Sequence, residues 1–98
     1  MESLLYDPIH PGEILREEFM ADYGLSADKV ATDIDVNLAA LTEVIAGHAP
    51  LAADFALRLS RYFSNSPEFW LNLQRGFDLA LALKSAKGLN AINPVHPA

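Results

Sequence analysis

The chain contains no cysteine, which excludes disulfide bonds and zinc–thiolate sites. It also lacks an uninterrupted apolar run of membrane-spanning length, because Asp, Glu, Arg or Gly breaks each hydrophobic segment. The N-terminal stretch MESLLYDPIHPGE has no basic flank and no small-residue cleavage site, so we expect no secretory signal. These absences favour a cytoplasmic protein. Because 51% of its 98 residues are hydrophobic, we expect a single folded domain over residues 1–98.

Basic residues are scarce as well. The chain has 7 Lys and Arg against 13 Asp and Glu, which gives a formal net charge of −6. A protein that coats nucleic acid through its phosphates is expected to be basic, so the composition excludes that class. Any DNA binding must therefore depend on local geometry and a few local cations, against an unfavourable overall field.

Residues that would indicate catalysis or a metal site are missing too. The 3 histidines, His10, His48 and His96, fall in an N-terminal arm, a loop and the C-terminal tail, without the spacing of metal ligands. Glu17 and Glu18 are adjacent and would face different directions on a helix, which does not suit a catalytic carboxylate pair. We therefore expect no enzymatic activity, no metal and no cofactor.

What the chain does contain is a regular succession of helix signals. Proline suits the first turn of a helix, serine or asparagine the cap before it, and glycine the left-handed position after it. Pro11, Pro67, Ser26, Asn37 and Gly47 occupy such positions. Together with the apolar spacing, they predict helices at 11–22, 27–33, 38–46, 52–63 and 67–84. We predict an all-α fold of five helices, with a helix-turn-helix at about 26–46.

The last predicted helix, 67–84, is apolar on more than one side, which is more than four short neighbours can bury. The surplus predicts a two-fold homodimer through this helix. The expected interface residues are Trp70, Leu73, Phe77 and Leu81. Trp70 fits either the core or an interface. A glycine- and proline-containing tail at about 88–98 is expected to fray, and the alternative is that it folds back over the apolar helix.

Three segments together resemble a known family. They are HPGEILREEF at 10–19, the helix-turn-helix at 26–46 and ALRLSRYFSNSPEFWLNLQ at 56–74. Over about residues 8–79 the chain is similar to the HigA/VapI-type antitoxins, a group within the XRE, or lambda-repressor-like, helix-turn-helix proteins. The resemblance implies a lambda-repressor-like fold and a cytoplasmic dimer that binds operator DNA and represses its own operon. It also implies a partner, a small basic RelE-like (HigB-type) ribonuclease toxin.

The expected DNA-contacting positions lie on both helices of the motif and just after it. They are Ser26, Lys29, Asn37, Ala39, Ala40, Thr42, Glu43 and His48. Helix N-termini suit phosphates, threonine and glutamate can hydrogen-bond to base edges, and alanine can pack on thymine methyls. Family members commonly carry basic residues at the exit, where this chain has His48 and Ala49. Residues 37–50 contain no lysine or arginine, so operator binding is expected to be weak.

The sequence leaves several alternatives open. Glu43 is either a cytosine contact or an acid on a solvated face, and His48 either approaches a phosphate or caps a helix end. The chain as a whole also fits a protein-interaction module of the same fold, whose acidic surface binds a basic ribonuclease with weak or no DNA binding. A third possibility is a transcriptional regulator that acts without a toxin.

Two further expectations concern the framework of the motif. Asp35 stands in the turn where the family usually has glycine, and aspartate tolerates a left-handed backbone better than most residues. Arg58 and Arg61 are expected to lay their stems on the core and pair with acids such as Glu17 or Glu18.

Overall fold

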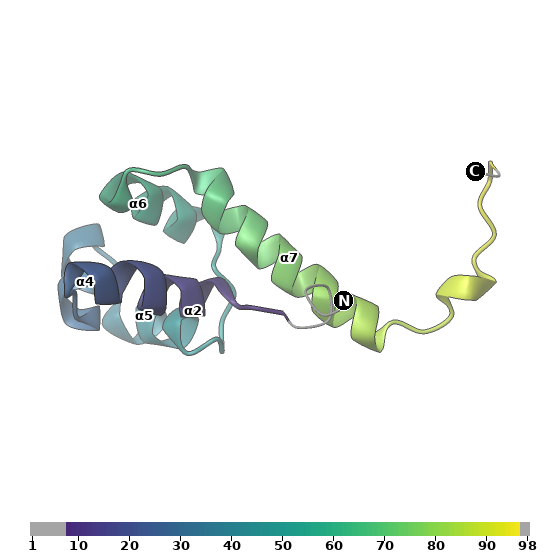
Figure 1. Cartoon of the computed structure of the whole chain (residues 1–98), viewed down its shortest axis with the longest axis horizontal. Coiled ribbons are helices and arrows are strands. Elements are labelled where there is room, and N and C mark those ends of the chain that lie inside the picture. Colours follow the sequence, from purple (N-terminus) through teal and green to yellow (C-terminus); the bar gives the residue numbers. More distant parts are fainter. Residues whose placement is uncertain (1–7, 97–98) are drawn as a thin grey trace.

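The computed structural model describes residues 8–96 of the chain (Figure 1). The predicted all-α class is confirmed, and the described residues contain no strand. The first helix consists of three consecutive segments: α2 (Pro11–Ile14), η1 (Leu15–Met20) and α3 (Ala21–Tyr23). The other four helices are α4 (Ala27–Ile34), α5 (Leu38–Ile45), α6 (Ala53–Phe63) and α7 (Pro67–Ser85). A short 3-10 turn, η2 (Leu89–Ala91), lies in the tail.

Side-chain caps set where the helices begin. Ser66 Oγ accepts the N–H of Phe69 at 3.1 Å and so caps α7, whose first residue is Pro67. Ser26 and Asn37 cap α4 and α5 in the same way, as predicted. These caps hold backbone N–H groups that have no partner inside the helix. The helix boundaries therefore lie within about two residues of those predicted from the sequence.

The first helix departs from a regular α-helix. Segment η1 has π-helical hydrogen bonding, a wider turn that the sequence spacing did not predict. A wider turn rotates the residues that follow it relative to an α-helix. Tyr23, which follows Leu15 and Phe19 at a spacing of four residues, is 64% exposed, and its ring stacks on Phe63 at a centroid distance of 5.8 Å.

Trp70 is the largest side chain of the core and is completely buried, at 0% exposed. Its Nε1–H donates to Asn65 Oδ1 at 3.0 Å, so the indole loses no hydrogen bond on burial. Phe19 and Phe69 pack on the ring, each with a centroid distance of 5.0 Å. The prediction of Trp70 as an interface residue is therefore wrong, because a side chain buried within one chain has no surface left for a second copy.

Helix α7 runs out of the globule and continues into an extended tail (Figure 1). The molecule accordingly measures 51 × 24 × 23 Å. All residues from 81 to 96 are exposed, so the alternative in which the tail folds back over α7 is not observed. Leu79, Leu81 and Leu83 are 55%, 44% and 40% exposed. Within residues 8–96 no helix combines the length and hydropathy that a membrane span requires.

Candidate nucleic-acid interface

Helices α4 and α5 cross through a small group of buried side chains. From α4 these are Val30, Ala31 and Ile34, at 0%, 4% and 6% exposed. From α5 they are Leu41 and Val44, at 0% and 3%. The short side chain of Ala31 lets the two backbones approach, which gives the motif its compact crossing.

The turn between the two helices has the left-handed residue predicted from the sequence. Asp35 has φ 58° and ψ 55°, and its N–H donates to the carbonyl of Thr32 at 3.3 Å. The N–H of Val36 donates to the carbonyl of Ala31 at 3.0 Å. Asp35 thus takes the conformation for which the family usually uses glycine, at the cost that a Cβ brings in this region.

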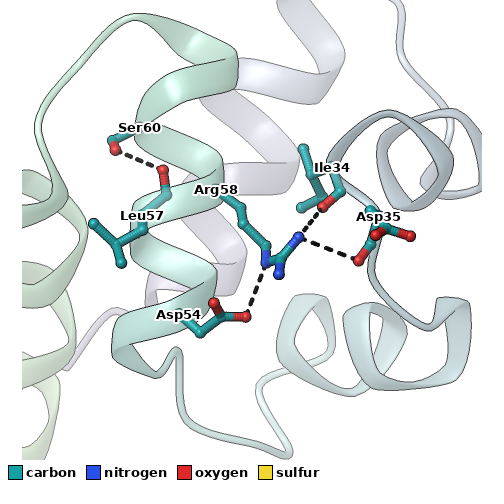
Figure 2. Close-up of polar contacts among 6 residues, drawn as sticks. All are labelled: Ile34, Asp35, Asp54, Leu57, Arg58 and Ser60. Carbon is teal, nitrogen blue, oxygen red and sulfur yellow. Dashed lines mark hydrogen bonds and ion pairs between the residues drawn. The ribbon is translucent and has the colours of Figure 1, made fainter.

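A side chain from α6 holds this turn in place (Figure 2). Arg58 Nη1 donates to the carbonyl oxygens of Ile34 at 2.9 Å and Asp35 at 3.4 Å, while Nε donates to Asp54 Oδ2 at 2.9 Å. Arg58 thus pairs with an acid, as expected, but with Asp54 and not with Glu17 or Glu18. The carbonyls that end α4 attract the guanidinium, and Asp54, one turn earlier on α6, orients it.

The outer face of α5 carries the predicted base-reading residues. Ala39, Ala40, Thr42 and Glu43 are all exposed, and positions 39, 42 and 43 share one side of the helix. The Thr42 hydroxyl donates to the carbonyl of Leu38 at 2.8 Å. Its oxygen is therefore left to act as a hydrogen-bond acceptor. This face offers two acceptors and several methyl groups, but no fixed positive charge.

Leu38 differs from its prediction. The helical spacing places it on the inward stripe of α5, yet it is 41% exposed. It occupies the first position of the helix, one turn before Leu41, and so lies beyond the buried crossing with α4. An apolar side chain is therefore available at the edge of the candidate interface.

The N-termini of α4 and α5 each keep free backbone donors beside a side-chain cap. Ser26 Oγ accepts the N–H of Lys29 at 3.1 Å, and Asn37 Oδ1 accepts the N–H of Ala40 at 3.0 Å. The earlier N–H groups of each first turn have no partner inside their helix. Two exposed helix ends with outward N–H groups suit phosphate oxygens.

The one lysine of residues 26–50 is already paired. Lys29 Nζ lies 3.1 Å from Asp33 Oδ2, and the Tyr62 hydroxyl donates to the same carboxylate at 2.5 Å. The hydrogen bond from Tyr62, and then that from Lys29, lowers the pKa of Asp33. The hydrogen bond to Asp33 raises the pKa of Tyr62 to about 12. Asp33 thus stays ionised and competes with any phosphate for Lys29.

Glu43 on α5 and His48 in the loop that follows it come together. Residues 46–51 of this loop are called the exit of α5. His48 Nδ1 lies 3.6 Å from Glu43 Oε1, and the two side chains are 69% and 57% exposed. Contact with the carboxylate is the only polar interaction that the structure gives this imidazole within residues 8–96. The alternatives for the two residues are therefore linked. If Glu43 contacts a base, it no longer holds His48, which is then free to approach a DNA phosphate.

Within residues 8–96, no group of three or more His, Asp or Glu side chains could hold a metal ion. His10, expected in the N-terminal arm, does lie before the first helix, but it is buried, at 8% exposed. Its Nδ1 accepts the N–H of Gly12 at 2.9 Å, which makes it the N-cap of α2. Histidine is not among the usual capping residues. Only its position directly before Pro11 could have indicated from the sequence that His10 caps this helix.

Comparison with known proteins places the chain. No family model matches it. Virulence-associated protein I of Dichelobacter nodosus is 41% identical over 87 residues, which make up 89% of this chain and 81% of that protein. Antitoxin HigA-1 of Vibrio cholerae is 35% identical over 72 residues, 74% of this chain and 67% of that protein. Antitoxin HigA of Pseudomonas aeruginosa, solved with the higBA promoter, is 36% identical with a TM-score of 0.83, and the match covers 91% of this chain and 99% of that one.

The chain is a lambda-repressor-like helix-turn-helix protein. The features that define this class are the buried crossing of α4 and α5, the left-handed turn between them and the flanking helices. Within that class, the chain belongs to the HigA/VapI-type antitoxin family, as the sequence motifs predicted. The named relatives are antitoxins and a virulence-associated protein rather than enzymes, which agrees with the expectation that this chain is not an enzyme.

Proposed function

We propose that the chain is a cytoplasmic helix-turn-helix antitoxin that binds operator DNA and represses its own operon. The observation that carries this proposal is the intact α4–turn–α5 geometry, with its exposed outer face on α5. The similarity to a HigA antitoxin solved with its promoter supports the same conclusion. The fold by itself would not support operator binding, because one fold serves many functions.

In this proposal phosphate contacts orient the motif and α5 reads bases. The N-termini of α4 and α5, capped by Ser26 and Asn37, face phosphates. Thr42 and Glu43 accept from base-edge amino groups, of which cytosine N4 is the natural partner of Glu43. The methyls of Ala39 and Ala40 meet thymine methyls. Lys29 and His48 add charge only after they leave Asp33 and Glu43.

A homodimer through α7 would present two copies of α5 to successive major grooves. Leu73 and Phe77 are half-buried on this helix, and Leu81 is 44% exposed. Leu79 and Leu83 are also exposed, and they lie on another side of the same helix. A second copy of α7 is the simplest cover for exposed leucines on a protruding helix.

We also propose that the chain neutralises a small basic ribonuclease of the RelE-like (HigB) type. The formal charge of −6 favours a basic partner. The similarity to antitoxins supports a toxin as that partner. Co-expression with the neighbouring reading frame, followed by affinity purification and a ribonuclease assay, tests this. A stable complex with suppressed ribonuclease activity is expected. If the neighbour is not a small basic protein, or does not bind, the regulator without a toxin becomes the better reading.

One observation favours a second function, a protein-interaction module with weak or no DNA binding. Residues 37–50 contain no lysine or arginine, and Lys29 is held by Asp33. Titration of the full chain into DNA from upstream of its operon separates the two functions. Preference for this DNA over a scrambled duplex supports the repressor. A toxin complex that forms with no shift of the upstream DNA supports the interaction module.

A further inference from the structure

The segment His10–Gly12 fixes the start of the first helix onto the end of α5. A Cβ placed on Gly12 would lie 1.9 Å from the carbonyl oxygen of Val44, so only glycine allows this approach. His10 Nδ1 accepts the N–H of Gly12, which holds the turn at the contact. The His10 ring also lies beside Gly47, where a Cβ would be 3.7 Å from its Cγ. The end of α5 and the exit that follows it thus rest directly on Gly12 and His10.

Helix α7 also holds the loop that follows α5. Buried Gln74 accepts the N–H of Leu51 at 2.7 Å through Oε1, and donates through Nε2 to Asp78 Oδ1 at 2.9 Å. The ring of Phe77 meets the His10 imidazole edge to face, with centroids 4.8 Å apart and planes at 76°. His10 is therefore in contact with α2, with the exit of α5 and with α7.

We propose that His10 is a positioning residue for operator binding, whose neutral imidazole holds the end of α5 at one place between α2 and α7. The inference rests on the proposed operator binding and concerns how the reading helix is oriented relative to the dimer helix. In a dimer, α7 would set the spacing of the two reading helices, so a loose joint at His10 would loosen that spacing.

The chemistry of the cap makes this joint sensitive to protonation. Nδ1 holds the N–H of Gly12 only as an acceptor, and a protonated imidazole has donors at both nitrogens. Burial lowers the pKa of His10 below its ordinary value of 6.5, although the Ala49 backbone and the Asp78 charge act in the opposite direction. A lowered folded pKa means that the contribution of His10 to stability is complete above 6.5 and is lost as the pH falls.

Other titratable groups lie on the elements packed around His10. They are Glu13 on α2, Glu43 on α5, His48 in the loop after α5, and Glu68, Arg75, Asp78 and Lys84 on α7. Of these, His48 and Asp78 line the same hollow as His10. His96 is exposed in the tail, does not line this hollow and is not among the proposed DNA contacts, so His96→Asn is the matched control for His10→Asn.

The experiment compares operator affinity of the full-length chain and both variants between about pH 7.5 and pH 5.5 at constant ionic strength. Asparagine offers its Oδ1 as a capping acceptor in place of the histidine Nδ1, and it removes the titration. Relative to His10→Asn, the unmodified chain should lose roughly two- to tenfold in operator affinity on acidification, the equivalent of one hydrogen bond. The His96→Asn variant should retain this loss. Equal pH profiles for the unmodified chain and His10→Asn would overturn the proposal.

A second measurement is independent of DNA. In an NMR titration of the unmodified chain, the amide signals of Ala46–Ala49 and Phe77 should follow the protonation of the His10 ring. Signals that do not follow it would refute the positioning role even if the operator binds. Absence of operator binding at every pH would instead refute the proposed function, while the NMR titration would still decide whether His10 couples α5 to α7.

Discussion

Tyr62 and Asp33 tie α6 to the last turn of α4 through a 2.5 Å hydrogen bond. We predict that Asp33→Asn returns the pKa of Tyr62 from about 12 toward 10.0, because the neutral amide no longer stabilises the phenol as a carboxylate does. Ultraviolet titration of tyrosinate, compared between the two proteins, measures the shift. An unchanged titration curve would mean that the contact does not form in solution.

The same pair predicts how stability depends on pH at both extremes. The pKa of Asp33 is lowered, so its contribution is present above its ordinary value of 3.8 and is lost as the pH falls. The pKa of Tyr62 is raised, so its contribution is present below 10.0 and is lost as the pH rises through about 12. Asp33→Asn should flatten both limbs of a melting temperature profile, and a profile identical to that of the unmodified chain would contradict this.

Gly12 gives a sharper test of packing at a single residue. Gly12→Ala forces a Cβ to within 1.9 Å of the Val44 carbonyl oxygen, which belongs to the backbone and cannot rotate away. We expect a loss of about 1–3 kcal/mol in the free energy of unfolding, measured with urea. Gly76→Ala is the control, because no atom lies within 4 Å of the added Cβ. It should raise stability by up to about 1 kcal/mol through helix propensity. Equal effects would contradict the close approach.

At the scale of elements, Arg58 connects α6 to the turn that joins the two helices of the motif. Arg58→Lys should lower the free energy of unfolding by about 1 kcal/mol, because one ammonium group cannot bridge Asp54 and two carbonyls with the fixed fork of a guanidinium. Urea unfolding measures the loss, with Arg61→Lys on the same helix as control. A variant as stable as the control would show that the clamp contributes nothing.

The elements themselves were largely predictable because their signals are local. Ser26, Asn37 and Ser66 cap helices as expected, and Asp35 takes the left-handed turn. The partner of Arg58 was not predictable, since it is a pair of carbonyls 24 and 23 residues away whose position depends on the finished fold.

The same limit applies to the burial of His10, which was not predicted, and to Trp70, for which the core and an interface were both open. His10 is buried because α7 and the exit of α5 close over it, and Trp70 because α7 turns that side toward Phe19. Helical spacing shows which residues share a face, but not which face meets the core. The π-type turn of η1 likewise has no sequence signal of its own and rotates Tyr23 outward.

At the scale of the whole molecule, the protruding half of α7 predicts self-association. Leu81→Asp should weaken the homodimer on the order of tenfold or more, because it places a charge in the apolar contact. Sedimentation equilibrium measures the change. Leu57→Asp is the matched control, since Leu57 is 57% exposed on α6, away from α7's protruding end. If both variants associate like the unmodified chain, the dimer does not form through α7.

Charge distribution decides how such a dimer would bind DNA. Each subunit offers Lys29 and, when protonated, His48 near the reading helix, against the acids Asp33 and Glu43 that hold them. Sequence preference must then come mainly from uncharged contacts of α5 and the backbone N–H groups at two helix ends. We expect lower salt sensitivity than is usual for a repressor.

The central claim is that α5 reads an operator although it carries no lysine or arginine. The most direct test measures the affinity of the full-length chain for upstream DNA and for a scrambled duplex over a series of salt concentrations. We predict a preference for the upstream DNA of at least about tenfold at each salt concentration, with a logarithmic salt slope of magnitude roughly 2–4, because one or two cations per subunit are available. Equal affinity for both duplexes, or no binding even at low salt, would contradict the account.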